Sequence, residues 1–345
     1  SLIYMKLSET EKTKLLQIEG ELTEHSFPPQ IVIETTSYCN MKCSHCSHVE
    51  LERPKAHMEE SLFKKIVKEI GEKSPQSEIW PTFYGEALIL GNQIWDYIDY
   101  ASREGCENIV LNSNGRLLDR ANHFDRILNS PLKRFILSLD GFSKATFESI
   151  RIGGNRDKIY SFVEELLYRK AKLNREYPVI IAQFSKMKEN EHEVDQFKKY
   201  WQRLGAEVKV RPKLEWASVG SIHADNLDHN PDFRIACPWG NNTMAIHQNG
   251  DIVACAVDWA GKFIAGNARD NTLEEIWKIL GERLRKYHRE HNWEGIPDIC
   301  KGCNDWQTAG ADYDEESVEG TRPFWYKNED KTNSPEDHGL ILPPS

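Results

Sequence analysis

Strand-like and helix-like segments alternate six times in the first two thirds of the chain. The first strand-like segment, residues 31–36, is apolar and rich in β-branched residues, and the others span residues 78–84, 107–112, 134–139, 178–184 and 206–211. The segments between them repeat apolar residues at helical spacing, as Leu62, Ile66 and Ile70 do. Such alternation predicts right-handed βαβ units and a parallel sheet. Six units are two fewer than a closed barrel needs, so we expect an α/β fold with an open, curved (β/α)6 sheet, a partial barrel.

The pattern changes after Pro212. Residues 214–236 hold few periodic apolar positions and are interpreted as a bridge, whereas residues 243–256 alternate as a β-hairpin around the turn signal Asn249-Gly250. A helix is predicted over residues 272–290. The chain is thus expected to contain an N-terminal helical extension, a core, a small C-terminal domain of a β-hairpin plus a helix, and an acidic tail. The predicted bounds are 1–29, 30–215, 216–310 and 311–345.

Composition excludes several classes of function. The formal net charge of −10, from 44 basic and 54 acidic residues, argues against a nucleic-acid partner, which requires a positive surface. No run of eighteen apolar residues and no secretory signal occurs, so neither a membrane span nor export is expected. A reducing cytoplasm is therefore the expected location. In that compartment the eight cysteines are expected to be metal ligands or free thiols.

Seven of the eight cysteines fall into two groups. Cys39, Cys43 and Cys46 have the spacing CxxxCxxC and follow the first predicted strand directly. Three thiolates can ligate three irons of a [4Fe–4S] cluster and leave the fourth iron open to a small molecule. A zinc knuckle completed by His45 or His48 is the alternative, but zinc sites usually add a distant second cysteine pair. The position also favours the cluster, since reactions on parallel α/β sheets occur at the carboxyl ends of strands.

This cysteine loop resembles the motif of the radical S-adenosylmethionine (radical SAM) superfamily, and motifs at three later strand ends resemble that family too. They are Phe83-Tyr84-Gly85-Glu86, Asn112-Ser113-Asn114-Gly115 and Ser138-Leu139-Asp140-Gly141. The resemblance implies a 5′-deoxyadenosyl radical formed from SAM at the open iron. It also implies that SAM is contacted by His45, Gly85, Glu86, Asn112, Asn114, Ser138 and Asp140. Tyr84 and Ala87 depart from the family's usual glycine and proline.

The second cysteine group contains Cys237, Cys255, Cys300 and Cys303. Four thiolates can saturate a second [4Fe–4S] cluster, although two distant cysteine pairs are also typical of a structural zinc ribbon. The surrounding residues resemble the SPASM/twitch extension of radical SAM enzymes: Cys237-Pro238-Trp239, Gly250 before Cys255, Asp258 and Gly266-Asn267. That resemblance favours one auxiliary [4Fe–4S] cluster over zinc.

An auxiliary cluster with four protein ligands is suited to electron transfer. We therefore expect oxidation of a hydroxyl-bearing carbon in a sugar, an aminocyclitol or a nucleotide-linked sugar, as in twitch-containing dehydrogenases that this chain resembles. Redox-neutral sugar epimerisation and modification of a ribosomal peptide are the alternatives. The remaining cysteine, Cys106, precedes a strand at the opposite end of the sheet, and we interpret it as structural.

Charged residues near the end of the sixth predicted strand are the candidates for substrate contact. Arg211, Lys213 and Glu215 could bind a hydroxylated or anionic substrate, and Glu215 or Lys213 could accept a proton. An ordinary solvated charge cluster is the alternative. A flavodoxin- or ferredoxin-type protein is the expected reductant.

Overall fold

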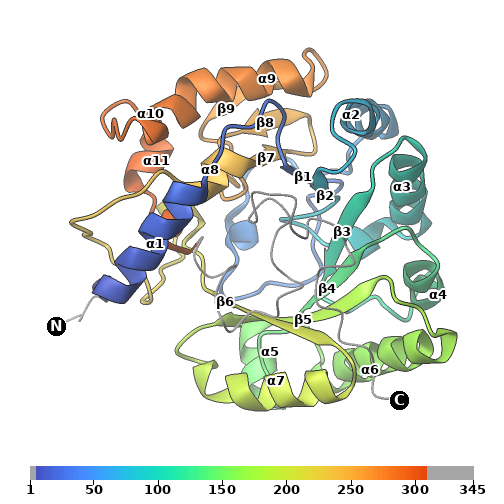
Figure 1. Cartoon of the computed structure of the whole chain (residues 1–345). Coiled ribbons are helices and arrows are strands. Elements are labelled where there is room, and N and C mark those ends of the chain that lie inside the picture. Colours follow the sequence, from blue (N-terminus) through green and yellow to red (C-terminus); the bar gives the residue numbers. More distant parts are fainter. Residues whose placement is uncertain (1–4, 309–345) are drawn as a thin grey trace.

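Six parallel strands form the core of the protein in the computed structural model, which describes residues 5–308 (Figure 1). They are β1 (Gln30–Ile33), β2 (Glu78–Trp80), β3 (Asn108–Ser113), β4 (Arg134–Ser138), β5 (Val179–Lys186) and β6 (Glu207–Pro212). Each pairs in parallel with the next along the chain. The predicted open (β/α)6 sheet is therefore confirmed. The predicted tail over residues 311–345 lies outside the described residues.

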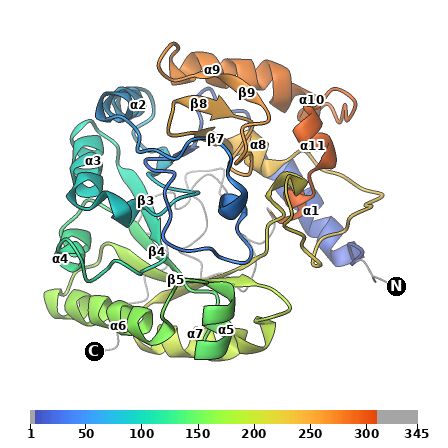
Figure 2. The same cartoon turned by 180° about the vertical axis from the view of Figure 1, so that it is seen from behind.

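Amphipathic helices cover the outer face of this curved sheet (Figures 1 and 2). They are α2 (Glu60–Lys73), α3 (Asn92–Arg103), α4 (His123–Leu128), α6 (Arg156–Leu173) and α7 (Val194–Arg203). Their apolar faces bury residues such as Phe63, Trp95 and Phe197 against the strands. Helix α4 has only six residues, and β2 ends at Trp80, before the predicted end at residue 84, because Pro81 cannot donate to the ladder.

Several shorter elements were not predicted. They are α5 (Lys144–Ile150), α8 (Pro238–Asn242), α11 (Asp298–Gly302) and the 3-10 turns η1 (Ser47–Glu50), η2 (Ala87–Leu90), η3 (Glu191–Glu193) and η4 (Trp216–Ser218). The N-terminal extension contains α1 (Glu9–Glu21), which begins with a reciprocal capping box between Ser8 and Glu11. No helix of the described residues is long and apolar enough to cross a membrane.

The predicted hairpin continues the same sheet. Strand β7 (Thr243–Ile246) pairs in parallel with β1, and β8 (Asp251–Val253) and β9 (Ile264–Asn267) follow antiparallel, so the sheet has the order β6-β5-β4-β3-β2-β1-β7-β8-β9. The side chain of Gln30 donates to Glu78 at 2.9 Å and accepts from Thr243 at 2.7 Å, which ties β1 to both neighbours. The hairpin turn has three residues, 248–250, and Gly250 adopts a φ of +95° there.

The predicted helix over residues 272–290 is present with an irregular centre. Helix α9 (Leu273–Leu280) and α10 (Lys286–Arg289) are joined by one π-helical turn, Gly281–Arg285. Figure 1 shows α9 and α10 beside the hairpin strands, at the edge of the sheet away from β6. The loop that follows β1 crosses the open inner side of the sheet in Figure 2, and it carries the first cysteine group.

Candidate active site

The thiols of Cys39, Cys43 and Cys46 line one cavity of about 150 Å³. Their loop leaves β1 and is anchored to the end of α5, because the N–H groups of Lys42 and Ser44 donate to the carbonyls of Ile152 and Ile150, each at 2.9 Å. Cys43 is buried, and Cys39 and Cys46 are partly buried. The loop predicted from the sequence thus brings three thiols to the carboxyl end of the sheet.

Gly85 lets the chain after β2 lie against the cysteine loop. A Cβ at this position would lie 2.4 Å from the carbonyl oxygen of Thr36 and 2.7 Å from that of Tyr38. The next N–H group, that of Glu86, donates to the same Tyr38 carbonyl at 2.8 Å. Glycine is therefore required here by close backbone approach.

Glu86 is buried at the floor of the cavity and is linked to the end of β3. Its carboxylate accepts from the Ser113 hydroxyl at 2.6 Å and from the Asn114 N–H at 3.0 Å. Burial raises the pKa of Glu86, and these two hydrogen bonds oppose that effect. The Asn114 amide also donates to Asn40 in the cysteine loop at 2.7 Å. The ends of β2 and β3 are thereby joined to the three-thiol loop.

Asp140 forms a buried ionic network beside the cysteines. Its carboxylate lies 2.5 Å from the Arg151 guanidinium and 3.2 Å from Nε2 of His45, and it accepts from the Ser185 N–H at 2.7 Å. Although burial opposes ionisation, Arg151 and His45 hold the pKa of Asp140 well below its usual range. Arg151 also donates to Sγ of Cys43 at 3.4 Å. It therefore brings a fixed positive charge to a sulfur ligand.

Most of the predicted SAM contacts line the same cavity: His45, Gly85, Glu86, Asn112, Asn114 and Ser138. Asp140 lies behind it, in the network with Arg151. Of the three predicted substrate residues, Arg211 is in the lining and Lys213 and Glu215 are not. The Glu215 carboxylate instead accepts from the Ala224 N–H at 2.9 Å in the bridge segment.

Sequence reasoning missed several lining residues, namely Trp80, Gln183, Ser185 and Trp216, and it assigned no cysteine contact to Arg151. Trp80, Gln183 and Ser185 lie on strands whose sequences are ordinary for a buried sheet. A signal was available for Arg151, because it follows a helix that begins directly after the Ser-Leu-Asp-Gly motif. Trp216 lies in the bridge, whose path back to the cavity no local sequence pattern indicates.

The cavity suits an iron cluster with a polar ligand. Within the described part of the chain, no fourth cysteine lines it. Nδ1 of His45 and Oδ1 of Asn112 are also buried, and neither has a hydrogen-bond partner among the residues that the structure describes. Burial raises the pKa of Cys46 to about 12 and that of Cys39 to about 11, so these thiols require a bound cation to be thiolates at neutral pH.

The second cysteine group occupies a separate, mainly apolar pocket. Cys237 precedes α8, Cys255 follows β8, and Cys300 and Cys303 flank the end of α11. Apolar side chains complete much of the lining: Ala254, Val257, Leu284, Ile299 and Trp306. The Asp305 N–H donates to Sγ of Cys303 at 3.3 Å. Four converging thiols in an apolar setting fit a cluster that has only protein ligands.

The two cysteine sites share a wall. Trp216 lines the first cavity and Ala217 lines the second, and both belong to η4. All three residues of η4 have positive φ, between +55° and +61°. The Asp305 carboxylate stabilises this unusual turn, because it accepts hydrogen bonds from the N–H groups of Glu215 and Ala217, each at 2.7 Å. Backbone strain therefore lies between the two sites.

Comparisons with known proteins agree with this arrangement. The family model of the radical SAM superfamily matches residues 33–181, and that of the iron–sulfur cluster-binding SPASM domain matches residues 237–304. The chain therefore contains a radical SAM domain followed by a SPASM domain. The two family matches imply SAM, a SAM-binding [4Fe–4S] cluster and an auxiliary cluster as cofactors of this radical SAM enzyme.

One curated relative is the S-adenosyl-L-methionine-dependent 2-deoxy-scyllo-inosamine dehydrogenase of Niallia circulans. It is 20% identical over 291 residues, which cover 79% of this chain and 92% of that protein. The crystal structure of BtrN in complex with AdoMet and 2-DOIA matches with a TM-score of 0.58 at 17% identity, over 82% of this chain and 94% of that chain. Streptococcus suis SuiB bound to precursor peptide SuiA matches with a TM-score of 0.61 at 13% identity, over 86% and 74%. At these identities the structural matches show a shared fold.

Proposed function

We propose that this radical SAM enzyme is a dehydrogenase that oxidises a hydroxyl-bearing carbon of a sugar, an aminocyclitol or a nucleotide-linked sugar. The observation that carries the proposal is the pair of cysteine sites with a shared wall. One site is a polar cavity with three thiols, and the other is an apolar pocket with four thiols. A cluster with three protein ligands can bind SAM for hydrogen abstraction, and a nearby cluster with four protein ligands can then accept an electron. The curated dehydrogenase supports the same reaction class.

In this proposal Cys39, Cys43 and Cys46 hold the SAM-binding cluster, and Cys237, Cys255, Cys300 and Cys303 hold the auxiliary [4Fe–4S] cluster. Bound there, these groups supply a 5′-deoxyadenosyl radical and an electron acceptor. The Gly85 backbone and the Glu86 carboxylate bind the methionine part of SAM. The polar side chains at the ends of β3 and β4, Asn112, Asn114 and Ser138, bind its remaining groups.

The substrate must lose one hydrogen atom, one proton and one electron to become a ketone. Arg211 is the charged residue on β6 that lines the cavity, and we assign it to binding of substrate hydroxyl or phosphate oxygens. Lys213 and Glu215 follow it in the sequence, outside the lining, and Glu215 already accepts hydrogen bonds from the bridge. We therefore propose Arg211, rather than Lys213 or Glu215, as the substrate contact. A flavodoxin- or ferredoxin-type protein is the proposed reductant.

An epimerase would have to return a hydrogen atom to the substrate radical. The thiol of Cys106 is 3% exposed, donates to the Val67 carbonyl at 3.5 Å and lines neither cysteine pocket. Its position therefore argues against its use as a hydrogen donor and favours dehydrogenation over thiol-dependent epimerisation.

The test compares Cys300→Ala with Cys106→Ala in anaerobically purified enzyme. SAM cleavage and substrate oxidation are both measured with a panel of aminocyclitols, sugar phosphates and sugar nucleotides. We expect Cys300→Ala to cleave SAM but to form no ketone, whereas Cys106→Ala forms ketone as the wild type does. Ketone formation at the wild-type rate by Cys300→Ala would contradict the electron-acceptor role. Conversion of a peptide, or of a sugar to its epimer, with no ketone in the panel would contradict the dehydrogenase assignment.

A further inference from the structure

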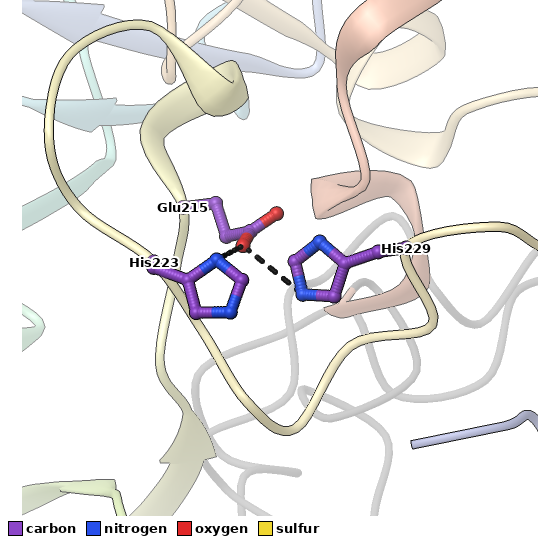
Figure 3. A group of neighbouring side chains, drawn as sticks. All are labelled: Glu215, His223 and His229. Atoms are coloured by element: carbon purple, nitrogen blue, oxygen red, sulfur yellow. Dashed lines mark ion pairs between the residues drawn. The ribbon is translucent and has the colours of Figure 1, made fainter. Parts of the chain in front are cut away.

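The bridge between β6 and α8 brings one carboxylate and two imidazoles together (Figure 3). Oε2 of Glu215 lies 3.5 Å from Nδ1 of His223 and 3.4 Å from Nε2 of His229. All three ligand atoms lie within 4.8 Å of one another. We propose that Glu215, His223 and His229 bind a divalent transition-metal ion, with zinc as the expected occupant, at a third site distinct from both cysteine groups.

The spacing matches the coordination geometry of zinc. Two ligands that each lie about 2.0–2.1 Å from a tetrahedral zinc ion are about 3.3–3.4 Å apart. The two distances from the Glu215 oxygen, 3.5 Å and 3.4 Å, are close to this value. Two histidines and one carboxylate form a known set for zinc and for iron(II), and such nitrogen and oxygen sites bind zinc more tightly than iron(II). His223 is half exposed, so solvent can supply the fourth ligand.

Neighbouring groups already orient the proposed ligands. Nε2 of His223 lies 3.4 Å from the carboxylate of Asp225, on the side of the ring away from Glu215. The Glu215 carboxylate accepts from the Ala224 N–H at 2.9 Å and from the Asn304 amide at 3.3 Å. Carboxylates behind ligating histidines, and hydrogen bonds to ligating carboxylates, are typical surroundings of protein metal sites. Metal binding would replace the contact of 2.9 Å between Nε2 of His229 and the Ala224 carbonyl.

The two imidazoles of the proposed site lie face to face beside a buried carboxylate. The rings of His223 and His229 are nearly parallel, with centroids 4.4 Å apart. A divalent ion would balance the charge of the Glu215 carboxylate, which is only 2% exposed, once the two rings have turned to bring the ion into their planes.

The position of the site indicates a structural role at the wall between the two cysteine sites. Glu215 lies between Leu214 and Trp216, which both line the three-thiol cavity. Asn304, which donates to Glu215, directly follows Cys303 of the four-thiol pocket. A bound ion would therefore hold the strained turn η4 and both flanking segments in place. The reacting groups lie in the cavity, outside the metal site.

The experiment uses anaerobically purified enzyme with its iron clusters in place. Zinc is titrated into it, and X-ray absorption at the zinc edge then identifies the ligands separately from iron. We expect one tightly bound zinc per chain with only nitrogen and oxygen neighbours at about 2.0–2.2 Å. Sulfur neighbours at about 2.3 Å would place the zinc on cysteines and overturn the proposal. Absence of stoichiometric zinc binding would overturn it as well.

Three variants test the ligand set. His223→Ala is expected to weaken zinc binding at least 100-fold, and Asp225→Asn about 10- to 100-fold, because it removes only a supporting carboxylate. His192→Ala is the control, since that side chain is exposed on η3 and lies 3.8 Å from Glu193. Unchanged iron content in each variant shows that the fold is retained. Unchanged zinc affinity in His223→Ala with full iron content would overturn the proposal. The test needs no substrate, so its outcome is independent of the proposed dehydrogenase activity.

Discussion

In the first cysteine group all three thiols come from one loop, residues 39–46, whereas the second group gathers its thiols from three segments between residues 237 and 303. The first cavity contains the charges of Glu86 and Arg151, and the second pocket is mainly apolar. A local loop can form its ligand set as soon as β1 and α5 are in place. The distributed set depends on the hairpin, α8 and α11 together, so cluster binding there is coupled to folding of the C-terminal region.

The first prediction tests whether the two sites are independent. Replacing Cys39, Cys43 and Cys46 together with alanine is expected to abolish SAM cleavage and to lower the iron content from about eight to about four per chain. The reason is that the distributed set does not use the loop. Iron and sulfide analysis with EPR of the reduced protein measures the outcome. Loss of all iron would show that the second site needs the first, and about four irons in the wild type together with one sulfur-bound zinc would make the second site structural.

The second prediction concerns the guanidinium that contacts a cysteine of the first site. Arg151→Met leaves Asp140 buried without its strongest partner, and breaking a buried pair in this way destabilises a protein by about 3–5 kcal/mol. The variant also loses the hydrogen bond to Cys43, so the reduction potential of that cluster is expected to fall. Denaturant unfolding and an EPR redox titration measure the two effects. Arg120→Met, at an exposed position, is the matched control. A reduction potential equal to that of the control variant would show that Arg151 does not influence the cluster.

The third prediction uses two glycines in opposite settings. Gly85→Ala forces a Cβ against the Thr36 carbonyl and is expected to destabilise the protein by about 1–3 kcal/mol and to weaken SAM binding, because Glu86 is displaced. Gly20→Ala is the control, because it lies in α1 with no atom within 4 Å of the added Cβ. Alanine there is expected to stabilise by about 0.5–1 kcal/mol. Equal effects of the two variants on SAM affinity would contradict close packing of the Gly85 segment against the cysteine loop.

The sequence predicted the first site better than the second for a physical reason. Strands such as β4 and β5 are encoded by local apolar runs, and the motifs at the ends of β2, β3 and β4 reach one cavity because parallel strands end at one edge of the sheet. The pairing of β7 with β1 is different, since no local pattern specifies which distant strand a hairpin will join. The same limit applies to His223 and His229. They lie in an aperiodic bridge, and their convergence on Glu215 depends on the path of the chain between them.

The last prediction concerns the cysteine that belongs to neither group. Cys106 is buried beside α2, and burial raises the pKa of its thiol to about 12, so it stays protonated and unreactive at neutral pH. Cys106→Ala is expected to retain all iron and full SAM cleavage and to lose only about 1 kcal/mol of stability from the small cavity that remains. Iron analysis and thermal unfolding against wild type provide the check. Loss of iron in this variant would mean that an eighth thiol takes part in a cluster, and the division into an open set of three and a closed set of four would no longer hold.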